Sequence, residues 1–229
     1  MQIVFVFIFG LIIGSFLNAV IYRLNQGSSA FRGRSFCPHC RHTLSWLDLI
    51  PLLSFSVLRG HCRYCHKRIS WQYPSVELAT ALLFSIVSVR FGSADLVSFR
   101  QVAYMAYTAF LVVIFVYDLK HYLILDKVIL PACIIVFIGN FLLGESVVRM
   151  LLAAAFAAGF FGLQFVISGG KWIGGGDIRL GFLMGLIIPW PLILVALLIA
   201  YILGSVVGMG LIASGKKTLG SKVPFGTFL

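Results

Sequence analysis

Long apolar runs alternate with short polar segments along most of this chain. A membrane-spanning helix needs about 20 apolar residues, and runs near that length cover residues 3–22, 76–89, 102–117, 128–143, 150–167 and 192–213. A further apolar stretch, residues 180–189, is too short to cross a bilayer unless the membrane is thinned or the helix borders a water-filled cavity. With that stretch included, the pattern predicts an all-α polytopic membrane protein of about seven spans.

Composition supports a membrane protein and excludes the soluble classes. Apolar residues make up 60% of the chain and charged residues 11%, against roughly 45–50% and about 25% in soluble domains. The mean hydropathy is +1.02. Disordered, coiled-coil and collagen-like chains are more polar or more periodic, so these classes are excluded.

The positive charge follows the predicted spans. The chain carries 18 Lys and Arg against 7 Asp and Glu. With the N-terminus outside, fifteen of these eighteen cations lie on the cytoplasmic side, as the positive-inside rule requires. Counting residues 180–189 as a crossing is necessary for this result. The first run has no basic residue before it and Arg23 after it, which favours an uncleaved anchor. Membrane orientation thus accounts for the excess charge, and no nucleic-acid partner is expected.

A polar segment, residues 24–73, contains two CxxC pairs separated by 21 residues. The spacing predicts a structural zinc site with four cysteine ligands, Cys37, Cys40, Cys62 and Cys65. Two disulfides are the alternative, which the reducing cytoplasm disfavours. A mixed Cys/His site is also open, although four cysteines already complete the coordination, so we expect the neighbouring histidines at the surface. The predicted organisation is a first transmembrane helix (1–23), a cytoplasmic zinc-binding domain (24–73) and a multi-span domain (74–229).

Three of the seven acids lie at the predicted cytoplasmic ends of apolar runs: Asp118, Asp126 and Asp177. An ionisable group at membrane depth is costly and is a functional candidate. Asp177 follows Gly174, Gly175 and Gly176, which permit close backbone approach and positive φ and are candidates for binding substrate or cofactor. Helix capping by Asp177 and solvated loop charge at the other two are the alternatives. Two carboxylates sharing a proton are the apparatus of aspartic proteolysis, which predicts a dyad.

Glu77 lies near the start of the second apolar run. A helix that begins at Pro74 would place it in the first turn, where the helix dipole favours an acid. A role in substrate or cofactor binding is the other interpretation.

These motifs together resemble the type IV prepilin peptidases, bifunctional leader peptidase/N-methyltransferases of the GxGD aspartic protease class. The resemblance covers nearly the whole chain and includes residues 14–18 (GSFLN) and Arg23, both CxxC pairs, 69–77 (ISWQYPSVE), 118–120 (DLK), 174–179 (GGGDIR) and 224–226 (PFG). By similarity, Asp118 and Asp177 match the catalytic pair. Asp126 follows Leu125, where the family often has proline, and is expected to be a loop acid.

The resemblance implies cleavage of the basic leader of prepilins or pseudopilins at the cytoplasmic face of the bacterial inner membrane. It also implies methylation of the new N-terminus with S-adenosylmethionine, in pilus biogenesis, type II secretion or competence. The family usually has a further span after the PFG segment, which we expect to be missing or truncated here. A membrane protein that only docks a partner does not explain glycines beside an acid. A proton-coupled transporter would carry its acids near the middle of its spans.

Overall fold

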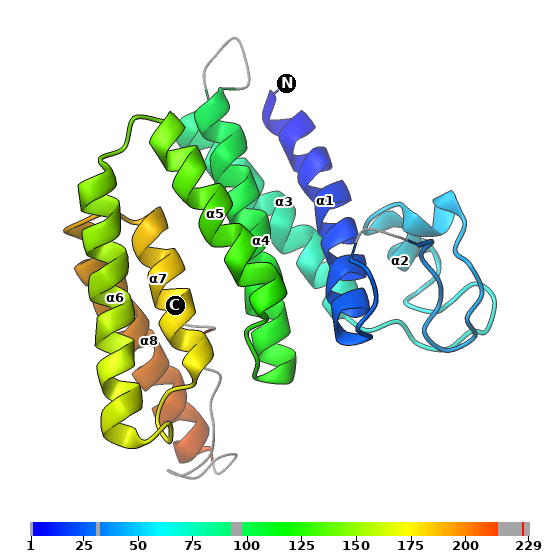
Figure 1. The fold of residues 1–229 in the computed structure, drawn as a ribbon. Coiled ribbons are helices and arrows are strands. Elements are labelled where there is room, and N and C mark those ends of the chain that lie inside the picture. The colour runs from blue at the N-terminus through cyan, green and yellow to red at the C-terminus, as the bar shows by residue number, and fades with distance from the viewer. Residues whose placement is uncertain (1, 31–32, 93–97, 215–225, 227–229) are drawn as a thin grey trace. The chain divides into compact units, whose positions relative to one another are not determined.

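The computed structural model describes residues 2–30, 33–92, 98–214 and 226, and these residues are mainly helical outside the Cys-rich segment (Figure 1). Each apolar run predicted from the sequence coincides with a helix, although the runs at 128–143 and 180–189 extend one and two residues past their helices. Five helices are long and apolar enough to cross a membrane: α1 (Gln2–Asn25), α3 (Gln72–Phe91), α4 (Phe99–His121), α6 (Val147–Ser168) and α8 (Leu192–Ala213). Two more, α5 (Asp126–Leu142) and α7 (Gly175–Ile187), are 17 and 13 residues long.

The helices form two compact units, Met1–Val113 and Ile114–Leu229, and α4 continues from one into the other. The division expected from composition, at residues 23 and 73, separates polar from apolar chain. The compact units follow helix packing instead, so the Cys-rich segment shares a unit with the helices on either side of it.

In the first unit, α1 and α3 form an antiparallel pair that packs at very short range. A Cβ added at Gly10 would lie 2.6 Å from the Cα of Ala81, and one at Gly14 would lie 2.7 Å from the Cα of Glu77. One turn further along α1, the Asn18 side chain donates to the carbonyl of Tyr73 over 3.0 Å. Small residues four apart let the backbones of two apolar helices come into van der Waals contact. In lipid, where no hydrophobic effect drives helices together, this close packing holds the pair.

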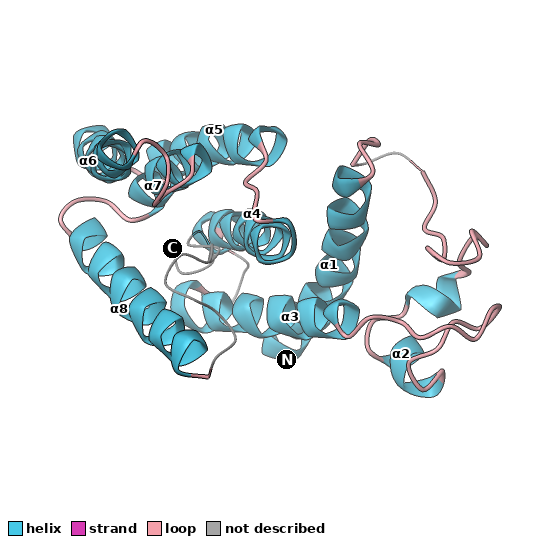
Figure 2. Ribbon diagram, turned by 90° about the horizontal axis from the view of Figure 1, so that it is seen from below, coloured by secondary structure: helices cyan, strands magenta, loops and turns pink. Residues whose placement is uncertain are grey.

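The segment between α1 and α3 consists largely of loops (Figure 2). It contains a 3-10 turn, η1 (Trp46–Leu49), and one short helix, α2 (Leu53–Val57). Two isolated antiparallel bridges, Phe36–Thr43 and His61–Arg68, close the turns that carry the cysteines.

In the second unit, α7 lies between α5 and α6 in both views (Figures 1 and 2). Gly181 and Gly185 face α6 so closely that an added Cβ would lie 2.5 Å from the Phe161 ring and 2.4 Å from the Cα of Ala154. On the other side, the Asn140 side chain of α5 donates to the carbonyl of Leu186 over 2.7 Å. A helix of about 20 Å is shorter than the bilayer core, and its packing against two neighbours buries it despite that length.

Local signals account for the ends of α7. Gly174 is its extended N-cap residue. At the other end, Ile188 is extended because the following proline disfavours helical backbone in the residue before it. The helix begins five residues before the apolar stretch at 180–189, so its first turn contains Asp177.

Candidate functional site

The four cysteines of the two CxxC pairs converge in one cluster. Their Sγ atoms all lie within 4.8 Å of one another, and those of Cys37 and Cys65 are 3.9 Å apart. All five cysteines of the chain are free thiols in the structure, so the disulfide alternative is not observed. Four thiolates at about 2.3 Å from a tetrahedral zinc would be about 3.8 Å apart, so the cluster fits a metal ion of that kind.

The two cysteine turns repeat the same backbone geometry. In the first, the Cys37 N–H donates to the carbonyl of His42 and the Arg41 N–H donates to the carbonyl of Cys37, both over 2.9 Å. In the second, the N–H of Cys62 donates to Lys67 over 2.9 Å and that of His66 donates to Cys62 over 3.0 Å. The residue four positions after each first cysteine has positive φ, 60° at Arg41 and 56° at His66.

The pKa values of two cysteines of the cluster move in opposite directions. A backbone N–H of Lys67 acts to lower the pKa of the Cys65 thiol, but burial and the neighbouring thiols outweigh it and raise the value to about 11, whereas the pKa of Cys37 falls. Burial acts to raise the pKa of the Cys37 thiol, but backbone N–H groups of Cys40 and His39 donate to the sulfur. Together with the neighbouring cysteines, they lower this pKa from 9.0 to about 7. Thiolate is the metal-binding form of cysteine.

The four neighbouring histidines are outside the cluster. His39, His42 and His66 are exposed, as expected from the sequence, whereas His61 is half-buried.

Asp48 supports the second cysteine turn, a role that the sequence interpretation missed. Its carboxylate accepts from the Arg63 Nε over 2.7 Å and from the Tyr64 hydroxyl over 3.1 Å. It also accepts from the N–H and hydroxyl of Ser45, over 3.0 and 2.8 Å. The signal was present, because Ser45 and Asp48 have the spacing of a capping box. Asp48 thus links η1 to the turn that contains Cys62 and Cys65.

Glu77 lies in the second turn of α3, because this helix begins at Gln72 and not at Pro74. The interpretation of Glu77 as a first-turn acid stabilised by the helix dipole is therefore wrong. The side chain is 7% exposed and its Oε2 accepts from the backbone N–H of Leu52 over 2.9 Å. This hydrogen bond attaches the Cys-rich segment to α3.

Asp118 and Asp177 are both buried in the second unit, 5% and 9% exposed. Asp118 lies in the last turn of α4 and Asp177 in the first turn of α7. The Gly174 N–H donates to Oδ2 of Asp177 over 2.9 Å, so this acid does cap its helix, although from inside the first turn. An acid in the last turn of a helix lies where the dipole disfavours negative charge, so capping does not explain Asp118.

Ile124 and Gly226 connect the surroundings of the two acids. A Cβ at Gly226 would lie 2.8 Å from Oδ2 of Asp118 and 3.1 Å from Cδ1 of Ile124. A Cβ at Gly176 would lie 3.0 Å from Cβ of Ile124. The Asp118 carboxyl and the start of α7 therefore border the same cluster of side chains. Pro224 and Phe225, the other residues of the PFG motif, lie outside the described residues.

The three glycines before Asp177 have different surroundings. Gly174 supplies the N–H that Asp177 accepts, Gly175 has no neighbour within 4 Å of an added Cβ, and Gly176 packs on Ile124. The expected close approach therefore occurs at Gly176. The expected positive φ does not occur in this run; it occurs earlier, at Gly169 and Gly170.

Asp126 is the first residue of α5 and forms an ion pair with Arg179 of α7. Both side chains are about half exposed, 53% and 49%. This acid therefore differs from the buried pair. It is solvent-exposed, as expected of a loop acid, but the expected loop is wrong, because Asp126 begins a helix.

Comparison with known proteins identifies the family. A model of the bacterial peptidase A24 N-terminal domain matches residues 8–91, and one of the type IV leader peptidase family matches residues 105–209. The boundary between these matches lies close to the division between the two compact units.

Three curated relatives carry the name prepilin leader peptidase/N-methyltransferase. The chain is 37% identical to the Myxococcus xanthus protein over 93% of its own length and 64% of that protein. It is 33% identical to the Bacillus subtilis protein over 96% of its own length and 87% of that protein. It is 31% identical to the Aeromonas hydrophila protein over 98% of its own length and 86% of that protein. No solved structure gives a significant match. The chain belongs to the multi-pass membrane proteins of the type IV prepilin leader peptidase/N-methyltransferase family, peptidase family A24.

Proposed function

We propose that this chain cleaves the leader peptide of type IV prepilins or pseudopilins with Asp118 and Asp177, and then methylates the new N-terminus. The observation that carries the proposal is the burial of both carboxyls in the second unit: Asp118 lies beside Gly226 and Ile124, and Asp177 directly follows Gly176, which packs on Ile124. Burial of an acid costs free energy and persists where the acid has a function. The third acid of this unit discussed above, Asp126, is exposed and ion-paired, so it offers no comparable chemistry.

In the proposed cleavage, one carboxylate takes a proton from water while the other, protonated, donates a hydrogen bond to the scissile carbonyl. Water oxygen forms a bond to the carbonyl carbon, the C–N bond breaks, and a proton passes to the leaving amine. Like charges in proximity keep the two acids from ionising together, so the pair titrates as a unit. The Gly174 N–H fixes one oxygen of Asp177 and leaves the other for this work.

Methyl transfer follows cleavage, because the nitrogen that accepts the methyl group is part of a peptide bond in the uncleaved substrate. S-adenosylmethionine supplies the methyl group, and the accepting amine loses a proton. We expect this step not to need the aspartates, since it requires no activated water.

We propose that the four cysteines hold a structural zinc ion and that seven helices cross the inner membrane, with the Cys-rich segment in the cytoplasm. The four thiols complete a tetrahedral shell and leave no position for water, as in structural zinc sites. The ion would connect two turns of a segment with a small core. The seven crossings include α5 and α7, which are short but packed together. In this arrangement the Asp118 and Asp177 ends of their helices face the cytoplasm.

The test of the peptidase is cleavage of a full-length prepilin by the purified protein, with the product N-terminus read by mass. Asp118→Asn and Asp177→Asn should each reduce cleavage more than about tenfold, because amides neither hold nor pass the proton. Asp126→Asn, the matched control, should retain most activity. More than a tenth of the normal rate in either of the first two variants would remove that residue from the pair. The Asp177→Asn protein should still methylate a pre-cleaved pilin.

Metal analysis tests the zinc site. One zinc per chain is expected, and serine at any two of the four cysteine positions should abolish it. Absence of zinc from the unmodified protein, together with oxidised thiols in cells, would contradict this assignment.

A further inference from the structure

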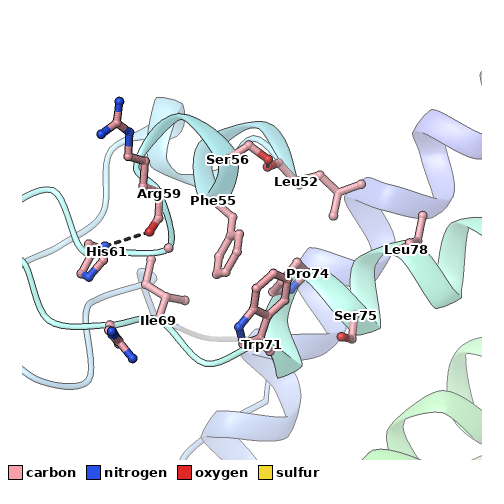
Figure 3. Close-up of a pocket in the computed structure, with 12 residues that line it drawn as sticks. Leu52, Phe55, Ser56, Arg59, His61, Ile69, Trp71, Pro74, Ser75 and Leu78 are labelled. Atoms are coloured by element: carbon pink, nitrogen blue, oxygen red, sulfur yellow. Dashed lines mark hydrogen bonds between the residues drawn. The ribbon is translucent and has the colours of Figure 1, made fainter.

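A cavity of about 740 Å³ lies in the first unit, where the Cys-rich segment meets the start of α3 (Figure 3). Its walls are mainly apolar and aromatic and include Phe55, Ile69, Trp71, Pro74 and Leu78. The Phe55 and Trp71 rings lie 5.0 Å apart between centroids. The cavity falls within the size range of small-molecule sites, about 300–1,000 Å³, and the proposed peptidase chemistry does not use it.

The α3 wall of the cavity continues as an apolar stripe along the helix. From the N-cap residue of α3 onward, exposed residues recur at helical spacing of three and four: Trp71, Ser75, Leu78, Leu82, Ile86 and Val89. Trp71, Ile86 and Val89 are 74%, 63% and 71% exposed. Because α3 is a candidate membrane span of a multi-pass protein, an apolar face that no other described helix of the first unit covers meets lipid. The cavity is therefore at the end of a lipid-facing stripe, with a tryptophan where membrane proteins carry their aromatic belt.

The mouth of the cavity is basic. Its lining includes Arg59, His61 and Arg68 and no acidic residue. The Arg59 side chain lies at the rim with its guanidinium turned outward in Figure 3, and its carbonyl accepts from the ring Nδ1 of His61 over 2.8 Å. His61 pairs in turn with Arg68 through the bridge of the second cysteine turn. The backbone of that turn thus holds both arginines close to the cavity.

Within the Cys-rich segment itself this positive charge has little acidic compensation. The nearest acid of α3, Glu77, is buried and accepts from the backbone N–H of Leu52, a lining residue. Residues 24–73 contain seven Lys and Arg and a single acid, Asp48. That acid is already paired with Arg63. A partner of this face should therefore be anionic at the mouth of the cavity and apolar along α3.

We propose that this cavity binds one anionic phospholipid of the surrounding bilayer. The phosphate lies at the mouth with Arg59 and Arg68, the glycerol region lies over Trp71, and an acyl chain follows Leu78 and Leu82. Arginine near a membrane surface attracts anionic lipid, and the stripe supplies the apolar half of the same ligand. The lipid connects the second cysteine turn to the membrane span.

The cavity suits a phospholipid better than S-adenosylmethionine. The methyl donor carries a sulfonium cation, which a carboxylate would stabilise. The lining of the cavity contains no carboxylate and two arginines. A soluble cofactor also gives no reason for the continuous apolar stripe that leads away from the cavity along α3. Binding of the methyl donor is therefore the outcome against which the lipid must be tested.

Native mass spectrometry of the full-length, delipidated protein in detergent tests the proposal. Phosphatidylglycerol and phosphatidylcholine with identical acyl chains are added in equal amounts. We expect one phosphatidylglycerol to be retained preferentially. The double variant Arg59→Gln/Arg68→Gln should lower its occupancy by about tenfold or more, because two cations at the phosphate are lost. The control variant Arg34→Gln/Lys67→Gln removes two exposed charges of the same segment outside the cavity lining and should retain the lipid.

A third variant tests the cavity without changing charge. Ser75→Trp places a large side chain on the α3 wall and should also displace the lipid, while the metal content reports that the Cys-rich segment remains folded. Equal loss of lipid in both double variants would show non-specific attraction and overturn the proposal. Full retention in Ser75→Trp, or displacement of the lipid by S-adenosylmethionine, would overturn it too. If the arginine variant loses its metal, the Ser75→Trp result decides.

Discussion

The contact between α6 and α7 makes the clearest quantitative prediction, through Gly185→Ala. The new Cβ would lie 2.4 Å from both Cα and N of Ala154 and 2.5 Å from the carbonyl carbon of Ala153. All three neighbours are backbone atoms, so no side chain can rotate away. Favourable carbon contacts begin at about 3.5 Å, so the two helices must separate by about 1 Å.

This separation should be visible both in stability and in catalysis. Overpacking of this kind costs about 1–3 kcal/mol, and in a protein of this size 1 kcal/mol shifts the melting temperature by about 2–4 °C. We therefore expect a melting temperature lower by roughly 2–12 °C in detergent. Asp177 lies two turns before Gly185 on the same helix, and a misplacement of about 1 Å can cost about a hundredfold in rate. If the proposed function holds, prepilin cleavage should fall by that order.

Gly162→Ala is the matched control, because a Cβ at Gly162 on α6 has no neighbour within 4 Å. It should leave cleavage unchanged and, through the higher helix propensity of alanine, stabilise by up to about 1 kcal/mol. Normal melting temperature and normal cleavage in Gly185→Ala would refute the reasoning. The α6–α7 contact would then be loose enough to accept a methyl group, and it would not position Asp177.

Two further predictions concern Asp48 and Gly226. Burial acts to raise the pKa of Asp48, but the Arg63 and Ser45 donors outweigh it and lower the value from 3.8 to about 2. Because Arg63 is 46% exposed, solvent weakens its ion pair with Asp48. Asp48→Asn should therefore reduce the stability of the metal-bound segment by about 1 kcal/mol. The assay is competition with a chelator at neutral pH, where zinc affinity should fall roughly fivefold. Because the pKa is lowered, the carboxylate stabilises the fold fully above about pH 4 and loses this effect only as pH falls through about 2. The difference in free energy of unfolding between variant and unmodified protein, followed by tryptophan fluorescence, should therefore stay constant down to about pH 4. A difference that disappears near pH 6 would contradict this. Gly226→Ala would bring Cβ to 2.8 Å from Oδ2 of Asp118 and should lower the cleavage rate by about tenfold with little change in melting temperature, whereas an unchanged rate would separate Gly226 from the site.

Features that depend on residues close together in the chain were predicted correctly, whereas those that depend on distant residues were not. The apolar runs predicted the helices to within a few residues, because every backbone hydrogen bond of a helix is made inside the run itself. The cysteine cluster was equally predictable, since each CxxC pair forms its own local turn. The only long-range feature to infer was that the two turns lie side by side. Glu77 shows the limit: its partner is Leu52, 25 residues away in a polar segment with no periodic pattern.

The sequence by itself determined the class of protein, the approximate position of each helix, the cysteine cluster and the family, because these depend on composition, short spacings and motifs. Only the tertiary structure decided which acids are buried and what surrounds them. Asp126 and Asp118 lie eight residues apart in the chain, yet one pairs with Arg179 at the surface and the other is buried beside Gly226. Both environments depend on contacts between residues far apart in the chain: Asp126 pairs with Arg179, 53 residues away, and Asp118 is buried beside Gly226, which is further away still. No local pattern encodes those contacts, because they are fixed by how closely the glycines of one helix let the next helix approach.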